Sequence, residues 1–375
     1  MSTHFFDALV DICGPDYARA ARSIDAVGGH RAGHVAVPAT AQAVGDVLRL
    51  AADEGLSVLP RGSGSKINWG PRRERVDLLL DSGRLSGLWS HDVEARTVEV
   101  ATGTPVRALQ AALALRGQRL PVDPPSRTAT LGGMLAVNES GPLRYHFRTP
   151  AEHVDRVSYA DPAGALGESD GEEGRPGLAE IAGVITSAVI RLQPLPAARR
   201  WVTVPLNSPA ELGKLTAPAG DFQPVAIETD LPAEGEGTLA ALIEGDEGDV
   251  AERAERLIAA WGPAAVAAPT APLWWGRYPF GPADVALRLS ASAADLPAMV
   301  YSLADVAGVP VPMRGSAGLG NVHAVLPGSL PADRIESIME TLRHVQMARG
   351  GQAVIITAPP ELAADLEMAA RPDCF

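Results

Sequence analysis

A glycine-rich loop directly follows a short apolar segment in the first quarter of the chain, and it constrains the fold more than any other feature. The loop reads Arg61-Gly62-Ser63-Gly64-Ser65-Lys66, and residues 56–60 before it are expected to form a strand. Glycine adopts positive φ at little cost, so successive backbone N–H groups can turn toward one point. Such a concave set of N–H groups binds a diphosphate, and the two serines add hydroxyl donors. Taken alone, the motif is as often a plain surface turn.

A second glycine motif, Thr130-Leu131-Gly132-Gly133-Met134, follows the pair Pro124-Pro125 and precedes Ser140-Gly141. A glycine pair between apolar residues lets a flat ligand lie against the backbone. The alternative is a helix entry with tight packing. The motif is weak evidence by itself, and it gains weight from its spacing to the first loop.

The apolar pattern around these motifs predicts alternating strands and helices. Thr40 is expected to cap a helix ending at Gly55, and Thr104 to cap one ending at Gly117. The expected strands of this half are 35–38, 56–60, 76–80, 97–101 and 181–192. Residues 1–30 are interpreted as a lead-in, and Pro194 and Pro196 mark a boundary.

The second half is expected to form one sheet with helices packed on one side. Its expected strands are 201–206, 225–228, 239–244, 285–290, 321–326 and 353–357, and its expected helices are 209–215, 250–261, 294–306 and 332–349. The sequence therefore predicts an α+β chain with a lead-in over 1–30, a first domain over 31–197 and a smaller α+β domain over 198–375.

Together, the two motifs and their surroundings resemble the PCMH-type FAD-binding domain of the vanillyl-alcohol oxidase and p-cresol methylhydroxylase family, most closely the E subunits of bacterial glycolate oxidases. The residues that carry the resemblance are 61–65, 98–125, 130–133, 140–142 and 183–186, with weaker matches at Trp275, 320–323 and 350–353. The resemblance implies a two-part FAD-binding domain followed by a substrate domain.

Carried over residue by residue, the resemblance implies a set of FAD contacts. Residues Arg61 to Lys66 would hold the pyrophosphate, and Thr130, Gly132 and Gly133 would line the flavin and ribityl chain. Ser140 and Gly141 would lie near the ring, and Val184 and Ile185 would supply backbone contacts. The loop contains neither His nor Cys, so FAD is expected to be bound non-covalently.

Two departures from the family pattern accompany the match. A long segment before the closing strand is replaced by the short acidic stretch 167–180, expected to be a solvated loop, and the chain lacks the family's usual ending. Either change could weaken or abolish cofactor binding.

His323, in the segment Gly320-Asn321-Val322-His323, is the sharpest catalytic candidate. A histidine near a flavin could act as a general base; the alternative is a hydrogen-bonded histidine on a half-buried strand. The His-x-His pair that accompanies this segment in metal-dependent relatives is absent, and Met313-Arg314 lies in that region instead. No metal is therefore expected.

Composition excludes several classes of function. The formal net charge of -13 argues against nucleic acid as a partner. With two cysteines, the chain cannot hold an iron–sulfur cluster alone. No apolar run approaches the roughly 20 residues of a membrane span, and the N-terminus lacks a secretion signal. A cytoplasmic protein is expected, with peripheral attachment to the inner membrane through partners left open.

These features predict an FAD-dependent oxidoreductase subunit of a glycolate- or lactate-type 2-hydroxyacid oxidase or dehydrogenase complex. A hydride would pass from the substrate's α-carbon to the flavin, and the electrons would leave through an iron–sulfur partner beside a second flavoprotein subunit. The alternative is a degenerate, non-catalytic scaffold subunit of such a complex. A nucleotide-sugar reductase of the same fold has no specific residue in its favour.

Overall fold

The computed structural model describes residues 3–73, 75–170, 178 and 181–369, and the chain divides into two compact units. The first unit comprises Met1–Asn68, Arg72–Glu139 and Thr149–Leu195. The second comprises Trp69–Pro71, Ser140–Arg148 and Pro196–Phe375. Two short segments of the N-terminal half therefore fold with the second unit.

The first unit contains a small, mostly parallel sheet with the order β1-β4-β6-β5. Strands β4 and β5 both run parallel to β6, and β1 is an antiparallel edge strand. Helix α2 connects β4 to β5, which lie on either side of β6 and run in the same direction. The bounds are β1 Ala18–Ala20, β4 His34–Ala36, α2 Ala41–Asp53, β5 Val58–Arg61 and β6 Leu78–Asp81.

The start of α2 is as predicted. The side chain of Thr40 accepts a hydrogen bond from the N–H of Ala43 at 3.1 Å. The apolar positions Val44, Val47, Leu48 and Ala51 are buried. They pack with α1 (Thr3–Cys13) in a core that includes residues from both sheets of the unit.

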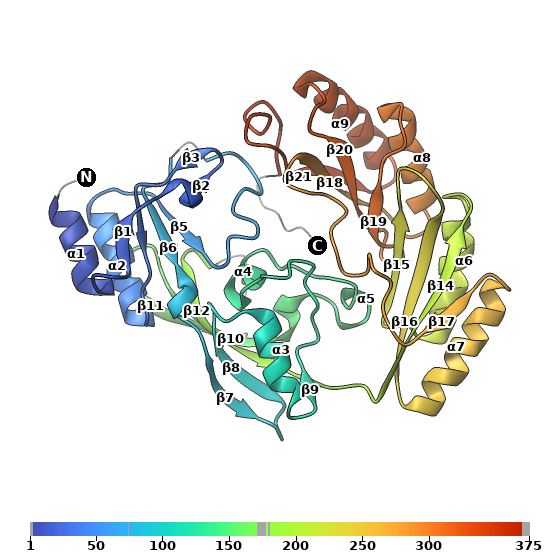
Figure 1. Ribbon diagram of the computed structural model, residues 1–375, viewed down its shortest axis with the longest axis horizontal. Helices are drawn as coiled ribbons and strands as arrows, with labels where there is room; N and C mark the ends of the chain where they lie inside the picture. Colours follow the sequence, from blue (N-terminus) through green and yellow to red (C-terminus); the bar gives the residue numbers. More distant parts are fainter. Residues whose placement is uncertain (1–2, 74, 171–177, 179–180, 370–375) are drawn as a thin grey trace. The chain divides into compact units, whose positions relative to one another are not determined.

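An antiparallel sheet with the order β11-β10-β12-β8-β7 forms the other part of the first unit (Figure 1). Its strands are β7 Leu88–Asp92, β8 Thr97–Ala101, β10 Val154–Ala160, β11 Leu166–Asp170 and β12 Val184–Arg191. This pair of sheets confirms the two-part architecture. The remaining elements of the unit are α3 Val106–Ala114, α4 Leu131–Ala136, β2 Ala26–Val27, β3 His30–Arg31, β9 Gln118–Arg119, β13 Gln193–Pro194 and the short 3-10 turns Ser23–Asp25, Ser82–Arg84 and Pro150–His153.

Two local predictions were wrong. Thr104 does not cap α3, because the N-cap of that helix is Pro105. The Oγ1 atom of Thr104 instead donates to the carbonyl of Ala101 at 2.7 Å and accepts from the N–H of Gly87 at 2.8 Å. The acidic stretch does not begin as a loop, because Glu168 pairs with Ser158 in the β10–β11 ladder. Residues 171–177 and 179–180 of that stretch lie outside the described residues.

The second unit is built on an antiparallel eight-stranded sheet with the order β17-β14-β16-β15-β19-β20-β18-β21. The strands are β14 Ala198–Leu206, β15 Ala226–Leu231, β16 Gly237–Gly245, β17 Val266–Ala268, β18 Asp284–Ser290, β19 Met313–Ser316, β20 Asn321–Pro327 and β21 Gln352–Thr357. The helices are α5 Arg144–Phe147, α6 Glu211–Ala219, α7 Glu247–Trp261, α8 Leu296–Ala307 and α9 Ala332–Met347, with a 3-10 turn at Gly220–Phe222.

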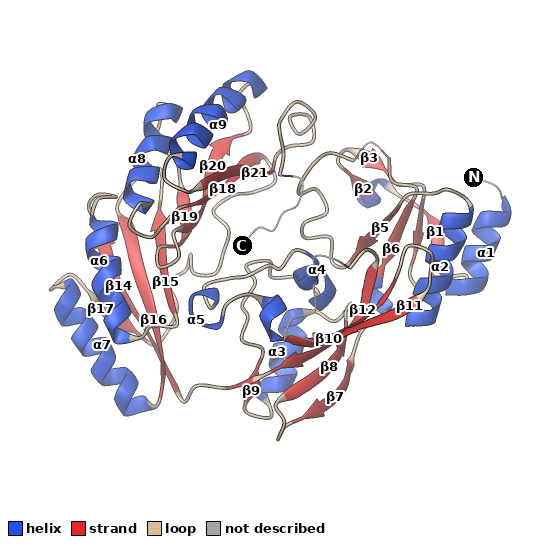
Figure 2. Ribbon diagram, turned by 180° about the vertical axis from the view of Figure 1, so that it is seen from behind, coloured by secondary structure: helices blue, strands red, loops and turns tan. Residues whose placement is uncertain are grey.

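Helices α6 to α9 lie on one side of this sheet, as expected from the sequence (Figure 2). Their buried side chains share one apolar core with alternate residues of the strands, such as Leu287, Val322 and Ala324. Because side chains alternate along a strand, the residues next to these three on the same strands face the other side of the sheet. There, two smaller apolar clusters take in Leu143 and Trp69 from the two early segments.

No helix of the described residues is long and apolar enough to cross a membrane.

Candidate functional site

The glycine loop turns sharply at Gly64, which has a φ of +76°. This backbone conformation favours glycine. Within the described residues, no hydrogen bond uses the backbone N–H groups of Gly62, Ser63, Gly64 or Ser65, nor the hydroxyls of the two serines. The side chains of Ser63 and Ser65 belong to exposed residues. The loop thus offers four N–H donors and two hydroxyls to a ligand.

The two glycine motifs are in contact. A Cβ placed on Gly62 would lie 2.1 Å from the Oγ1 atom of Thr130, so only glycine fits there without a shift. A Cβ on Gly132 would lie 2.8 Å from the Cβ atom of Thr102. The fold therefore brings together the two motifs that the sequence paired by spacing.

The second motif is also the entry of helix α4, so the packing interpretation holds for part of it. Thr130 caps the helix, and its Oγ1 accepts from the N–H of Gly133 at 3.3 Å. The N–H groups of Leu131 and Gly132 donate to the carbonyls of Thr104 and Thr102. These N–H groups are occupied, and the motif offers the exposed backbone of Gly133 as a flat surface rather than a set of donors.

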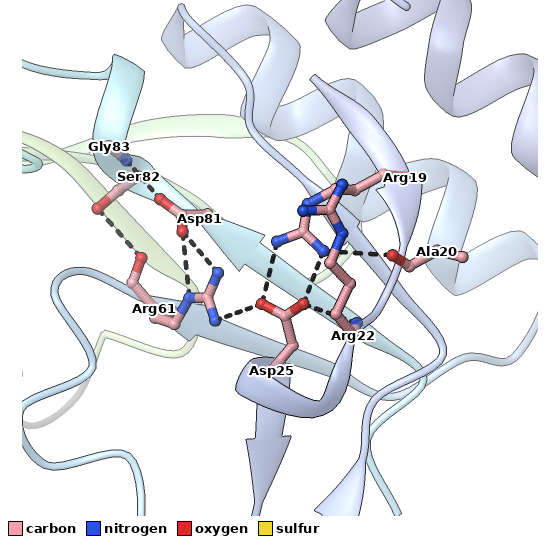
Figure 3. A network of polar contacts seen from close by, with 8 residues as sticks. All are labelled: Arg19, Ala20, Arg22, Asp25, Arg61, Asp81, Ser82 and Gly83. Carbon is pink, nitrogen blue, oxygen red and sulfur yellow. Dashed lines mark hydrogen bonds and ion pairs between the residues drawn. The ribbon is translucent and has the colours of Figure 1, made fainter. Parts of the chain in front are cut away.

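Arg61 faces a network of carboxylates (Figure 3). Its Nε and Nη2 atoms donate to Asp81 at 3.1 and 2.8 Å, and its Nη1 atom donates to Asp25 at 3.0 Å. Asp25 also accepts two hydrogen bonds from Arg19 and one from the N–H of Arg22. The hydrogen bonds from Arg19, with those from Arg22 and Arg61, hold the pKa of Asp25 well below its usual range.

Sequence reasoning missed Asp25 and Arg19, because they lie in the segment interpreted as a lead-in. Asp25 is buried, with 1% of its side chain exposed. A buried carboxylate requires partners, and an acidic residue on a short turn carries no sequence signal that would name them.

Lys66, at the other end of the loop, forms a buried ion pair with Glu139. Its Nζ atom also lies 2.7 Å from the hydroxyl of Ser126. Glu139 accepts in turn from the N–H of Ser126 at 3.0 Å. Lys66 therefore links the glycine loop to the turn before the second motif and to the segment after it.

Val184 and Ile185 open strand β12. Val184 is buried in the core beside α1 and α2. The carbonyl of Ile185 accepts from the Oγ1 atom of Thr102 at 2.7 Å, next to the contact of Thr102 with Gly132. Both residues thus belong to the strand end near the second motif, and their contact with FAD stays a prediction.

Ser140, Gly141 and His323 belong to the second unit. Ser140 is buried, and the carbonyl of Gly141 accepts from the N–H of Arg144 at 3.1 Å. Their roles near the flavin stay predictions.

A row of charged side chains crosses the face of the second unit's sheet opposite helices α6 to α9. Arg288 on β18 stands opposite His323 on β20, which stands opposite Arg314 on β19. The Nε atom of Arg314 donates to Asp230 of β15 at 2.8 Å. Two guanidinium groups thus flank an imidazole, and that of Arg314 is already paired with the carboxylate of Asp230.

Aromatic rings surround His323. The rings of Tyr278 and Phe280 lie 5.1 and 5.9 Å from the imidazole, and Trp69 contacts both of them. Burial, followed by the positive charge of Arg288, lowers the pKa of His323 to about 3. The imidazole is therefore neutral at neutral pH and a weak base. Trp275, between Trp201 and Trp274, belongs to a packing cluster on the same unit.

Among the described residues, no group of three or more His, Cys, Asp or Glu side chains is arranged to hold a metal ion.

Comparisons with known proteins agree with this architecture. Residues 32–169 match the family described as FAD binding domain. An uncharacterized FAD-linked oxidoreductase of Mycobacterium tuberculosis (strain H37Rv) is 26% identical over 133 residues, which is 36% of this chain and 29% of that protein. A D-lactate dehydrogenase of Archaeoglobus fulgidus is 26% identical over 120 residues, 32% of this chain and 27% of that protein. The matched segments thus span under a third of these relatives.

The fold extends beyond the matched segment. Two structures of alkyldihydroxyacetonephosphate synthase align with TM-scores of 0.72 and 0.70 at 16% and 15% identity. Each alignment covers 94% of this chain, and 80% and 82% of the other chains.

Fold and loop geometry together define a flavin-binding class of protein. Residues 32–169 match the FAD binding domain family, and this match and the FAD-linked relatives support FAD as the cofactor. The donors of the glycine loop fit the diphosphate of this cofactor, because they are the groups that a diphosphate requires and no described residue engages them.

Proposed function

We propose that the chain is an FAD-dependent oxidoreductase subunit that acts on a small 2-hydroxyacid of the glycolate or lactate type. The observation that carries this proposal is the set of available N–H groups in the loop from Gly62 to Ser65, held in contact with Thr130 of the second motif. When bound, FAD supplies the two-electron acceptor for such an oxidation.

The second unit supports the choice of substrate. Arg288 and Arg314 lie on either side of His323 in one row across the sheet, and a 2-hydroxyacid carries a carboxylate that guanidinium groups bind well. A carboxylate beside Arg288 would offset the charge that helps to lower the pKa of His323. In this proposal Arg288 and Arg314 orient the substrate, and the neutral imidazole of His323 receives the proton of the substrate's hydroxyl group.

Electrons must then leave the flavin. The two cysteines of the chain are too few for a cluster, so we assign this step to an iron–sulfur subunit, with a second flavoprotein subunit in the same cytoplasmic complex. The D-lactate dehydrogenase among the relatives is consistent with the substrate class.

Substrate-dependent dye reduction tests the proposal. The chain, co-expressed with a candidate flavoprotein subunit and a candidate iron–sulfur subunit, should reduce a dye with glycolate or lactate. Arg288→Gln should raise the KM at least tenfold, because one carboxylate partner is lost. Arg256→Gln, on the exposed face of α7, is the matched control. An FAD-loaded complex that oxidises none of these acids would contradict the substrate; a chain that takes up no FAD would favour the non-catalytic scaffold.

A further inference from the structure

Two cations, Arg61 and Lys66, stand at the two ends of the glycine loop. A cation beside a diphosphate site is ordinarily interpreted as a phosphate ligand, and the sequence alone gives no reason to depart from that interpretation. Their observed partners indicate a different role.

We propose that Arg61 and Lys66 are positioning residues, which fix the shape of the glycine loop by pairing with carboxylates elsewhere in the first unit. The diphosphate is then held by the backbone N–H groups and serine hydroxyls of residues 62–65. This inference rests on the proposed binding of FAD by the loop.

The guanidinium group of Arg61 is fully engaged. All three of its nitrogen atoms donate to carboxylates, two to Asp81 and one to Asp25. Asp81 is itself held, because its Oδ1 atom accepts from the N–H of Gly83 at 2.8 Å. The planar fork of arginine fits such an arrangement, which the point charge of lysine cannot reproduce. Turning the guanidinium toward a phosphate would break every one of these bonds.

The ammonium group of Lys66 is equally committed. Glu139 has no exposed side-chain area, and its charge requires a counter-ion inside the protein. Lys66 supplies that counter-ion and reaches Ser126 as well. The resulting link fixes the end of the glycine loop to the segments on either side of the second motif.

The charges at both ends of the loop are thereby compensated. Arg61 and Arg19 face Asp25 and Asp81, and Lys66 faces Glu139. What remains for an anionic ligand is the set of unengaged N–H groups at residues 62–65, which requires a well-defined loop shape and no side-chain charge.

A removal-and-rescue experiment on the purified full chain tests this proposal. Apoprotein is titrated with FAD by flavin fluorescence, well below the unfolding temperature of every variant. Lys66→Met should weaken FAD binding at least tenfold, because the link between the end of the glycine loop and the buried carboxylate of Glu139 is lost. The double variant Lys66→Met/Glu139→Gln removes both charges and should return the affinity to within about threefold of wild type. A double variant as weak as the single one would show that Lys66 touches the phosphate, and would overturn the proposal.

Arg61→Lys provides an independent test that does not depend on the folding of the double variant. It keeps the positive charge and loses the fork that binds Asp25 and Asp81. Positioning predicts at least a tenfold loss of FAD affinity; near-wild-type affinity would mean that charge is what the diphosphate needs, and would overturn the proposal. Arg49→Lys is the matched control: Arg49 pairs with Asp46 on α2 and donates to the carbonyl of Gly164, and its replacement should leave the FAD affinity unchanged. A wild-type chain that binds no FAD would instead refute the proposed function.

Discussion

Gly62 and Thr130 approach so closely that a methyl group on Gly62 would lie 2.1 Å from the threonine Oγ1 atom. The glycine of the first motif is therefore required by the second motif, as well as by any ligand. Thr130 is fixed in place because it caps helix α4. The two motifs form one structural feature, and a change in either should be felt in the other.

Gly62→Ala should destabilise the folded chain. Overpacking of this kind costs roughly 1–3 kcal/mol, and it should be accompanied by weaker FAD binding because the loop must shift. Thermal unfolding of apoprotein, followed by FAD titration, measures both. Gly248→Ala is the control. Gly248 lies on helix α7, and a Cβ atom at this position would meet no other atom within 4 Å. A Gly62→Ala protein with unchanged stability and FAD affinity would show that the contact with Thr130 is not restrictive.

Gly64→Val should abolish FAD retention while most of the fold persists. The φ of Gly64 is +76°, and an L-residue there costs about 1–2 kcal/mol, more for a β-branched side chain. Gly55→Val carries a similar penalty, because Gly55 has a φ of +62° and open space around its Cβ position. Both variants should lose comparable stability, and only Gly64→Val should lose flavin absorbance after gel filtration. Full flavin occupancy in Gly64→Val would refute the assignment of the loop.

The lowered pKa of His323 makes stability depend on pH in a defined direction. The folded pKa is about 3, and the unfolded value is about 6.5. Between these values the unfolded chain binds the proton more readily, so this contribution to stability is complete above about pH 6.5 and declines as the pH falls toward 3. His323→Gln removes it. From pH 7 to pH 4.5, wild type should therefore lose roughly 2.5 kcal/mol more of its unfolding free energy than the variant does.

Urea denaturation at both pH values measures this difference. His4→Gln, a change to an exposed side chain of α1, is the control and should follow wild type. Equal acid sensitivity of wild type and His323→Gln would mean that the imidazole is not held neutral by its surroundings.

The isolated chain should turn over 2-hydroxyacids slowly, because it cannot itself pass electrons to an iron–sulfur centre. Co-expression with candidate flavoprotein and iron–sulfur subunits should yield a complex that remains intact through gel filtration and reduces a dye. Rapid, multiple-turnover dye reduction by the chain alone would argue against an obligatory partner.

Local patterns in the sequence predicted the longer helices and most strands of the second unit, but not β7, β10 and β11 of the first unit's antiparallel sheet. The helical spacing of Val44, Val47, Leu48 and Ala51 behind a threonine cap is a strong signal, and α2 follows it closely. The strand β19, Met313–Ser316, was missed because it is four residues long and contains an arginine and a glycine. Its pairing with β15 and β20 is set by tertiary contacts, which no local pattern reports.

The candidate site was only partly accessible to sequence reasoning. Glycine motifs are visible because they restrict residue type at fixed spacing. The partners of Arg61 and Lys66 are not, since Asp25 lies 36 residues before Arg61 and Glu139 belongs to a different segment from Lys66. The fold brings these four charged residues together, whereas a single sequence shows only that Asp25 and Glu139 are acidic and not which cations they pair with.

FAD binding by the purified chain tests the central claim most directly. When apoprotein is titrated with FAD, flavin fluorescence should be quenched to an endpoint near one FAD per chain, and the absorbance of bound flavin should develop. The Gly64→Val variant should show neither the quenching nor the absorbance. The short segment before β12 leads us to expect weaker retention than is usual in the family, so occupancy should fall on dialysis and return when FAD is added. A folded wild-type chain that shows no saturable binding, or binding that Gly64→Val reproduces in full, would contradict the account.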